Sequence, residues 1–277
     1  MSGWTEICDV GRDGDRLRAI LPIFLIDDHP NISKPYKILL ERDEAGERIL
    51  TLYFSEPECV SLHEFLKGEI GFEVRVELAR QLLQTVQFLH DRKLAHNLMT
   101  TDNIFVKCTS EGPVLKLAAL HTCNSVSRPC DNYNCVRNYR PPEVIVCATS
   151  DSISVDTWVV GCVLFEICNS REAFSLVSSK VDGTIIPKLA KQQVETILRL
   201  IGTPTVDEFA HMYPESRKQS ILQISAEKSL GSCISESVYK KGWLWLIDSC
   251  LQFHPGKRAS IQTLINDFDE KFSPKVL

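Results

Sequence analysis

Residues 94–106 read Leu-Ala-His-Asn-Leu-Met-Thr-Thr-Asp-Asn-Ile-Phe-Val, and this stretch decides how the rest of the chain is interpreted. It holds a histidine, His96, and an asparagine seven positions later, Asn103, ahead of the apolar run Ile104–Val106. The residues before it, Glu73–His90, carry apolar side chains at the three- and four-residue spacing of an amphipathic helix. The sequence therefore predicts a helix, a polar loop and a short strand in succession.

The regions on either side of this loop show further periodic patterns. Upstream, the β-prone runs Tyr36–Leu40 and Ile49–Phe54 flank a charged segment, which predicts a hairpin. Downstream, Val155–Cys168 is apolar on nearly every face, so a helix here should lie at the centre of the fold. Residues 1–15 show no strand pattern, and residues 121–138 lack periodicity, which predicts a loop. We also expect a short helix at Ser61–Leu66, strands at Ile104–Lys107 and Val114–Leu117, and helices at Arg16–Ile26, Lys188–Ile201, Lys240–Leu251 and Ala259–Phe268.

The composition excludes several classes of function. The 277 residues carry a formal net charge of −5, with a pI near 5.8, which argues against non-specific nucleic-acid binding. No apolar run approaches the roughly 18 residues that a membrane span requires. The first residues lack the basic and apolar regions of a secretory signal. These features predict an intracellular protein, cytoplasmic or nuclear, that contacts neither nucleic acid nor membrane.

The cysteines do not form a pattern typical of a metal site. There are 11 of them, an odd number scattered over a long chain, so most should be reduced and buried as small hydrophobic residues. The densest group is Cys123, Cys130 and Cys135, and its spacing differs from the C-x-x-C pattern of a zinc knuckle. We therefore expect no metal at this group.

Several motifs, taken in order, resemble those of one enzyme family. His96 and Asn103, with the apolar run after them, resemble the H-R-D-L-x-x-x-N catalytic loop of eukaryotic protein kinases. The other landmarks are similar to family motifs in their order and spacing, and Gly202-Thr203-Pro204 is similar to the cyclin-dependent-kinase-like branch. These landmarks are His29–Ile32, Tyr139–Glu143, Asp156–Glu166, Leu200–Pro204 and His254–Ser260.

The resemblance implies an α+β, protein-kinase-like fold with a mainly helical large lobe and a truncated, β-rich small lobe. Residues 1–28 are expected to be an N-terminal segment with a partial helix similar to the family's αC helix. Residues 29–58 would form the residual small-lobe hairpin and the hinge, and residues 59–277 the large lobe. An alternative is that the sequence is an incomplete part of a longer kinase, which would supply the missing strands.

The catalytic loop departs from the family pattern where the chemistry should lie. Leu98 stands at the position of the family's catalytic aspartate, and Asn97 stands at that of its arginine. Asp102 could be considered as a replacement base, but we interpret it as a turn residue before Asn103. His96 is interpreted as a core histidine that packs inside the fold.

The groups that hold ATP and magnesium in the family are also missing. The D-F-G triplet is replaced by Ala119, Leu120 and His121, so the metal-binding aspartate is an alanine. Residues 1–33 contain no lysine, and Ile20 stands where the αC glutamate would be. Asn103 is the one magnesium ligand of the pattern that remains. We therefore expect no catalytic residue, no metal and no ATP cofactor.

The residues that match the family are those with structural roles in it. The resemblance implies that Glu143 pairs with Arg258, and that Asp156 caps the backbone around the His96 loop. It also places His96 and Leu120 in an apolar spine through the core.

Two classes of function remain open on this basis. The leading hypothesis is a catalytically inactive kinase-like domain, a pseudokinase, that acts as a protein-binding scaffold or regulator. A partner, residues 1–28 or a second copy would then cover the edge of the Tyr36–Phe54 hairpin. The alternative is an unconventional or weakly active ATP-dependent serine/threonine kinase.

Overall fold

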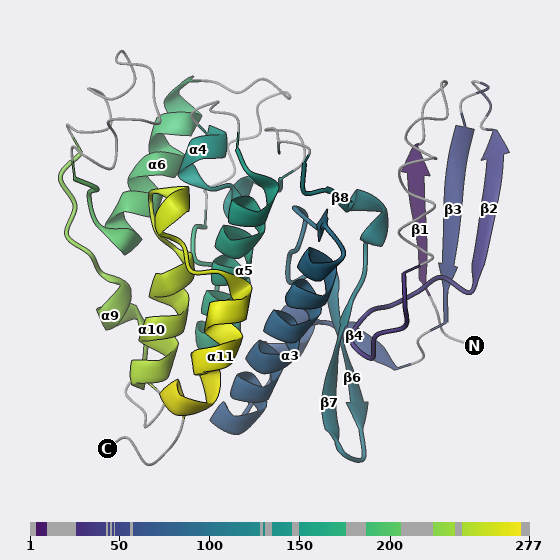
Figure 1. Ribbon diagram of the computed structural model, residues 1–277, viewed down its shortest axis with the longest axis horizontal. Helices are drawn as coiled ribbons and strands as arrows, with labels where there is room; N and C mark the ends of the chain where they lie inside the picture. The colour runs from purple at the N-terminus through teal and green to yellow at the C-terminus, as the bar shows by residue number, and fades with distance from the viewer. Residues whose placement is uncertain are drawn as a thin grey trace. The chain divides into compact units, whose positions relative to one another are not determined.

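The computed structural model describes residues 4–9, 26–42, 44, 46, 48–55, 58–127, 130, 135–145, 150–175, 187–205, 224–235 and 240–272. The chain divides into two compact units, residues 1–125 and residues 126–277 (Figure 1). This division differs from the boundaries expected at residues 28 and 58. The segment from residue 59 to residue 125 belongs to the first unit because its long helix and its hairpin pack on each other and on the turn before the small sheet.

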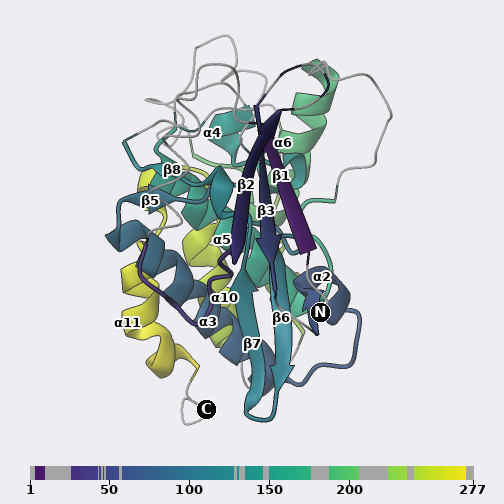
Figure 2. The ribbon, with the colours of Figure 1, turned by 90° about the vertical axis from the view of Figure 1, so that its right-hand side faces the viewer.

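The first unit begins with a three-stranded antiparallel sheet, which we call the small-lobe sheet (Figure 2). Its strands are β1 (Trp4–Asp9), β2 (Lys37–Arg42) and β3 (Arg48–Phe54), with β3 in the middle. Leu50, Leu52 and Phe54 alternate along β3 and are almost fully buried, which is the period of a half-buried strand. The predicted hairpin is confirmed as β2 and β3.

β1 corrects the expectation that the first 15 residues contain no strand. It pairs with β3 from Trp4 opposite Phe54 to Asp9 opposite Ile49, and so covers the edge of β3 that faces away from β2. Its sequence, Trp-Thr-Glu-Ile-Cys-Asp, alternates too weakly to indicate a strand, and the pairing with β3 supplies what the local pattern lacks. The helix predicted at Arg16–Ile26 lies outside the described residues, except for Ile26.

The rest of the first unit consists of a long helix and a hairpin. The helix α3 (Phe72–Asp91) confirms the predicted amphipathic helix and packs against β7 (Gly112–Leu117). β7 pairs with β6 (Ile104–Thr109), which in turn pairs with β4 (Cys59–Ser61). The short helix α2 (Leu62–Phe65) begins after Ser61, whose hydroxyl accepts a hydrogen bond from the Glu64 N–H as an N-cap.

A turn at residues 29–33 joins the segment before β2 to this hairpin. The Asn31 carbonyl accepts from the Leu117 N–H at 2.7 Å, and the Ser33 N–H donates to the Leu117 carbonyl at 2.9 Å. The side chain of Gln81 on α3 holds the turn from the other side. Its Oε1 accepts from Asn31 Nδ2 at 2.9 Å and from the Leu115 N–H at 2.7 Å. One glutamine therefore ties together the turn, the hairpin and the long helix.

The second unit is helical and is built around α5 (Ser152–Asn169). Asp151 caps its first turn by accepting from the Ser154 N–H at 2.9 Å, and the helix ends at Ser170 with a left-handed φ of 53°. All residues from Val155 to Ile167 are buried, which confirms the predicted central helix. The helix α10 (Lys240–Cys250) packs on it.

The remaining elements of this unit surround the central helix (Figure 1). The helices predicted near residues 188–201 and 259–268 are confirmed, and the last one begins two residues later than expected because Ser260 is its N-cap. The elements are η3 (Arg137–Tyr139), α4 (Pro142–Ile145), α6 (Pro187–Ile201), α9 (Leu230–Cys233), η4 (Pro255–Lys257) and α11 (Ile261–Lys271).

α5 also corrects the statement that no apolar run has the length of a membrane span. Ser152–Asn169 has 18 residues with a mean hydropathy of 1.3, so length and composition alone would allow it to cross a bilayer. In the structure, however, 78% of this stretch is buried inside the protein. Its apolar side chains form part of the core of the second unit.

Candidate functional site

The loop between β5 (Leu94–Ala95) and β6 contains His96, which has no exposed surface. Its Nε2 lies 2.9 Å from the Ala118 carbonyl, and its Nδ1 lies 3.4 Å from the Leu98 N–H and 3.5 Å from the Thr122 hydroxyl. When the ring proton is on Nε2, this nitrogen donates to the Ala118 carbonyl, and Nδ1 accepts from the Leu98 N–H. His96 therefore connects this loop to the segment after β7, as expected of a core histidine.

The next residues fold as a tight turn that uses backbone groups. Asn97 has a left-handed φ of 61° and is 2% exposed, and the Leu98 N–H donates to the His96 carbonyl at 2.8 Å. The side chain of Asn103 closes the loop because its Nδ2 donates to the Leu98 carbonyl at 3.1 Å. Asp102 is exposed on the turn before Asn103, in agreement with its interpretation as a turn residue. The loop thus has a defined shape in which Leu98 carries an aliphatic side chain.

The segment that replaces the D-F-G triplet lies against the same loop. The Ala118 N–H donates to the Asn103 carbonyl at 3.1 Å, so the two segments are joined directly. Ala119 has a left-handed φ of 56° and is 4% exposed, and Leu120 and His121 begin the 3₁₀ helix η2 (Leu120–Thr122). The structure therefore brings Leu98, Asn103 and Ala119 to one place, as the motif spacing predicts.

Two residues of this region were not singled out from the sequence as structural groups. The Thr122 hydroxyl donates to the Ala119 carbonyl at 2.8 Å and also lies 3.3 Å from the His96 carbonyl. Gln81 holds the hairpin from α3, as described above. A threonine three residues after a tight turn often closes it with its hydroxyl, so the first could have been found. Gln81 gave no comparable signal, because its partners are distant in the sequence.

The second unit holds the predicted ion pair between Glu143 and Arg258. Nη1 of Arg258 lies 2.6 Å from one carboxylate oxygen and Nη2 lies 2.7 Å from the other, and both side chains are 1% exposed. Arg258 also donates to the Ser154 carbonyl at 2.9 Å and to the Gln252 carbonyl at 3.1 Å. The bidentate geometry and the extra acceptors satisfy the buried guanidinium. Asp156 is fully buried in the same unit, and its predicted capping role stays a prediction.

The chemistry available to these residues is limited. Leu98 and Ala119 offer neither a proton acceptor nor a metal ligand, and within the described ranges no group of three His, Cys, Asp or Glu residues could hold a metal ion. Burial raises the pKa of Cys250 to about 12 and raises the pKa of Cys135 and Cys162 well above the usual range of a thiol. These three thiols are therefore protonated at neutral pH and are poor nucleophiles.

Comparison with known proteins agrees with the motifs. Residues 21–268 match the protein kinase domain family. The chain is 27% identical over 206 residues to the CTD kinase subunit alpha of Saccharomyces cerevisiae. This match covers 73% of this chain and 36% of that protein. It is 27% identical over 249 residues to a probable serine/threonine-protein kinase, glkA, of Dictyostelium discoideum, and the match covers 88% of this chain and 48% of that protein. It is 28% identical over 191 residues to cyclin-dependent kinase 14 of Mus musculus, and the match covers 67% of this chain and 38% of that protein.

The chain spans less than half the length of each of these three relatives. The family match, in contrast, extends over most of the chain and contains every landmark from His29 to Ser260. With its α+β fold, its helical second unit and its Glu143–Arg258 pair, the chain therefore belongs to the protein kinase domain family, in the branch that includes the cyclin-dependent kinases.

Proposed function

We propose that the chain is a catalytically inactive kinase-like domain, a pseudokinase, that acts as a scaffold or regulator by binding other proteins. The observation that carries the proposal is Leu98. The loop around it keeps its backbone and side-chain hydrogen bonds, through His96 and Asn103, while the position of the general base holds an aliphatic group. A general base contributes about 10²–10⁴-fold to a rate, and nothing at this position can supply it.

The proposal includes the absence of ATP and magnesium as cofactors. Phosphoryl transfer depends on charges placed around the phosphates and the metal. The residues present do not fit ATP and Mg²⁺. Ala119 ends in a methyl group, which cannot bind the metal, and β1 contains no lysine for the phosphates. Asn103 could contribute one amide oxygen, but a single neutral ligand does not hold Mg²⁺ against water.

We infer that the protein partner binds at the small-lobe sheet. β2 lies at one edge of it, and the side chains of Tyr36 and Leu40 are 67% and 50% exposed on or beside that strand. An exposed strand edge with apolar side chains is open to pairing or packing with another chain. β1 pairs with β3 on the side away from β2, so residues 4–9 cover one edge of the β2–β3 hairpin. Residues 1–28 were one of the three covers of this hairpin expected from the sequence. The partner would be an intracellular protein, cytoplasmic or nuclear, rather than a nucleic acid or a membrane.

Thermal unfolding with ATP, with and without Mg²⁺, tests the proposal. A ligand present at about 100 times its Kd stabilises the folded state by about 2.7 kcal/mol, which a melting curve detects readily. We expect millimolar ATP to leave the melting temperature unchanged, with or without the metal. A magnesium-dependent increase that the Asn103→Ala variant abolishes would instead favour the alternative, an unconventional ATP-dependent kinase. The same measurement on a longer form of the protein would test the hypothesis that this sequence is an incomplete part of a longer kinase.

A further inference from the structure

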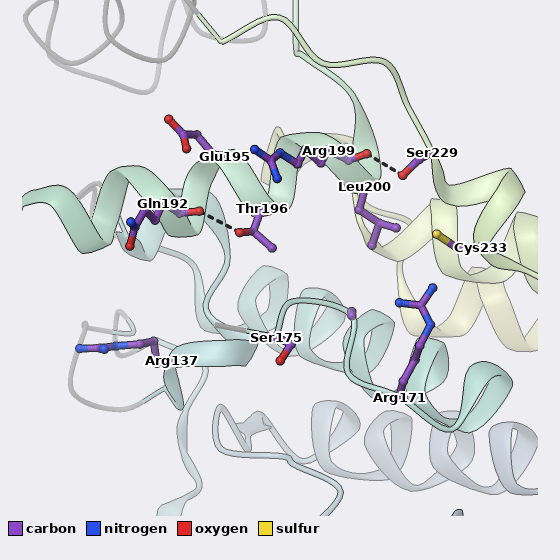
Figure 3. A pocket seen from close by; sticks show the side chains of 11 residues that line it. Arg137, Arg171, Ser175, Gln192, Glu195, Thr196, Arg199, Leu200, Ser229 and Cys233 are labelled. Carbon is purple, nitrogen blue, oxygen red and sulfur yellow. Dashed lines mark hydrogen bonds between the residues drawn. The ribbon is translucent and has the colours of Figure 1, made fainter. Parts of the chain in front are cut away.

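The second unit contains a cavity that is lined by no residue of the loop described above. Its volume is about 560 Å³, within the range of roughly 300–1,000 Å³ that is usual for ligand sites. Figure 3 shows α6 along one wall and the segment after α5, with Arg171 and Ser175, along the opposite wall. Arg137, from η3, completes the lining at one end. All of these residues belong to the unit formed by residues 126–277.

The lining is locally basic in a chain that is acidic as a whole. The lining contains three arginines, Arg137, Arg171 and Arg199, and one glutamate, Glu195, whereas the net charge of the chain is −5. The three arginine residues are exposed, and none of them forms an ion pair with an acidic group of the described residues. Glu195 is engaged elsewhere, with Lys191 at 3.8 Å. Three guanidinium groups are thus available to an acidic ligand.

One of these arginines has an oriented side chain, and the backbone of another is fixed to α6. The guanidinium of Arg171 lies 5.1 Å from the centre of the Phe165 ring, which orients its charge. The carbonyl of Arg137 accepts a hydrogen bond from the Gln193 side chain, which fixes η3 against α6. The neighbouring carboxylate of Glu172 accepts from Asn138 Nδ2 at 3.1 Å. The charge of Arg171 is therefore oriented before a ligand arrives, which reduces the entropic cost of binding at this residue.

The arrangement suits an extended ligand that has both acidic groups and N–H donors. Arg137 and Arg171 lie well apart in the cavity, so one small anion would not reach both (Figure 3). In the same lining, the Thr196 hydroxyl donates to the Gln192 carbonyl at 2.9 Å and the Ser229 hydroxyl donates to the Arg199 carbonyl at 2.7 Å. Because these hydroxyls already donate within the protein, they can bind a ligand only as acceptors. A peptide backbone supplies N–H donors to such acceptors, and a nucleic-acid backbone does not.

We propose that this cavity binds an extended acidic peptide segment of a partner protein, with carboxylates paired to Arg171, Arg199 and Arg137. The site gives a surface and a partner chemistry to the scaffold role proposed above, and in that sense rests on it. Its test measures peptide binding, whereas the test of catalytic inactivity measures the response to ATP and Mg²⁺. Either proposal can therefore fail while the other holds.

The test uses fluorescence anisotropy with a labelled peptide of alternating glycine and glutamate, and the same peptide with glutamine in place of glutamate. We expect the full chain to bind the acidic peptide in preference to the neutral one. Arg199→Gln should weaken binding about threefold, or about 0.7 kcal/mol at 1.4 kcal/mol per tenfold, which is typical of an exposed charge pair. Glu195→Gln should tighten binding, because it removes the one negative charge of the lining.

Lys241→Gln serves as the matched control, since it removes one exposed positive charge on α10, outside the cavity. It should leave the affinity unchanged, and melting curves should show that all three variants are folded. Equal binding of the two peptides, or equal effects of Lys241→Gln and Arg199→Gln, would overturn the proposal. A short oligothymidylate that binds more tightly than the peptide, and in an Arg199-dependent manner, would overturn it in favour of a general polyanion site.

Discussion

Replacing Arg258 with alanine removes the cation of a buried ion pair and leaves its partner, Glu143, without a counter-charge. The wild-type guanidinium makes two bonds to the Glu143 carboxylate, at 2.6 and 2.7 Å, and one each to the carbonyls of Ser154 and Gln252. It also lies 5.0 Å from the Trp158 ring, on the central helix. Alanine would leave a carboxylate that is 1% exposed and two carbonyls without this donor.

The size of the effect follows from this burial. Removing one partner of a buried ion pair costs about 3–5 kcal/mol, because the remaining charge stays desolvated. A change of 1 kcal/mol shifts the melting temperature of a domain of roughly 150–250 residues by about 2–4 °C, so we expect a decrease of about 6–20 °C. The adjacent exposed residue offers a control, and Lys257→Ala should change the unfolding free energy by no more than about 0.5 kcal/mol.

Urea unfolding followed by tryptophan fluorescence reports this effect selectively. Three of the four tryptophans, Trp158, Trp243 and Trp245, lie in the unit that contains the ion pair. The double variant Glu143→Leu with Arg258→Met should recover more than half of the loss, because it no longer buries an isolated charge. A loss below about 1 kcal/mol for Arg258→Ala, or a double variant less stable than either single variant, would refute the reasoning.

Three further predictions concern pH, packing and thiol reactivity. Burial first, then Arg92 and Lys116, lower the pKa of His29 below 6.5, so the folded state binds fewer protons than the unfolded state. Stability to urea should therefore fall as the pH drops below 6.5, and His29→Gln should remove that decline. Gly161→Ala should destabilise the protein by about 1–3 kcal/mol in urea unfolding, because the new methyl group would lie 2.7 Å from atoms of both Cys250 and Leu251. Because the pKa of Cys250 is raised to about 12, this thiol should resist a disulfide reagent in the native protein, whereas the exposed Cys108 should react; equal rates in mass-spectrometric mapping would contradict the buried position of Cys250.

Much of the fold could be predicted from local patterns, and the exceptions have a common cause. The helix α3 and the hairpin of β2 and β3 follow from hydrophobic period, and the Glu143–Arg258 pair follows from motifs that are far apart in the chain. β1 could not be predicted in the same way, because its strand conformation depends on pairing with β3, 40 to 50 positions away. The basic cavity depends on the tertiary arrangement of α6 with segments before and after it.

Asn103 separates the structural interpretation of the catalytic loop from a catalytic one. Its Nδ2 donates to the Leu98 carbonyl at 3.1 Å, so its amide nitrogen, and not only its oxygen, has a role. Asn103→Asp keeps an oxygen ligand and adds a negative charge, which would strengthen a metal site, but it replaces the donor with an acceptor that faces a carbonyl. If the residue serves the loop, Asn103→Asp and Asn103→Ala should each lose about 0.5–1.5 kcal/mol or more of unfolding free energy, and Mg²⁺ should not restore it. If the residue serves a metal, Mg²⁺ should stabilise the aspartate variant more than the wild type. Urea unfolding of both variants, with and without Mg²⁺, distinguishes the two, because only the loss of a donor predicts that the aspartate and alanine variants are similarly impaired.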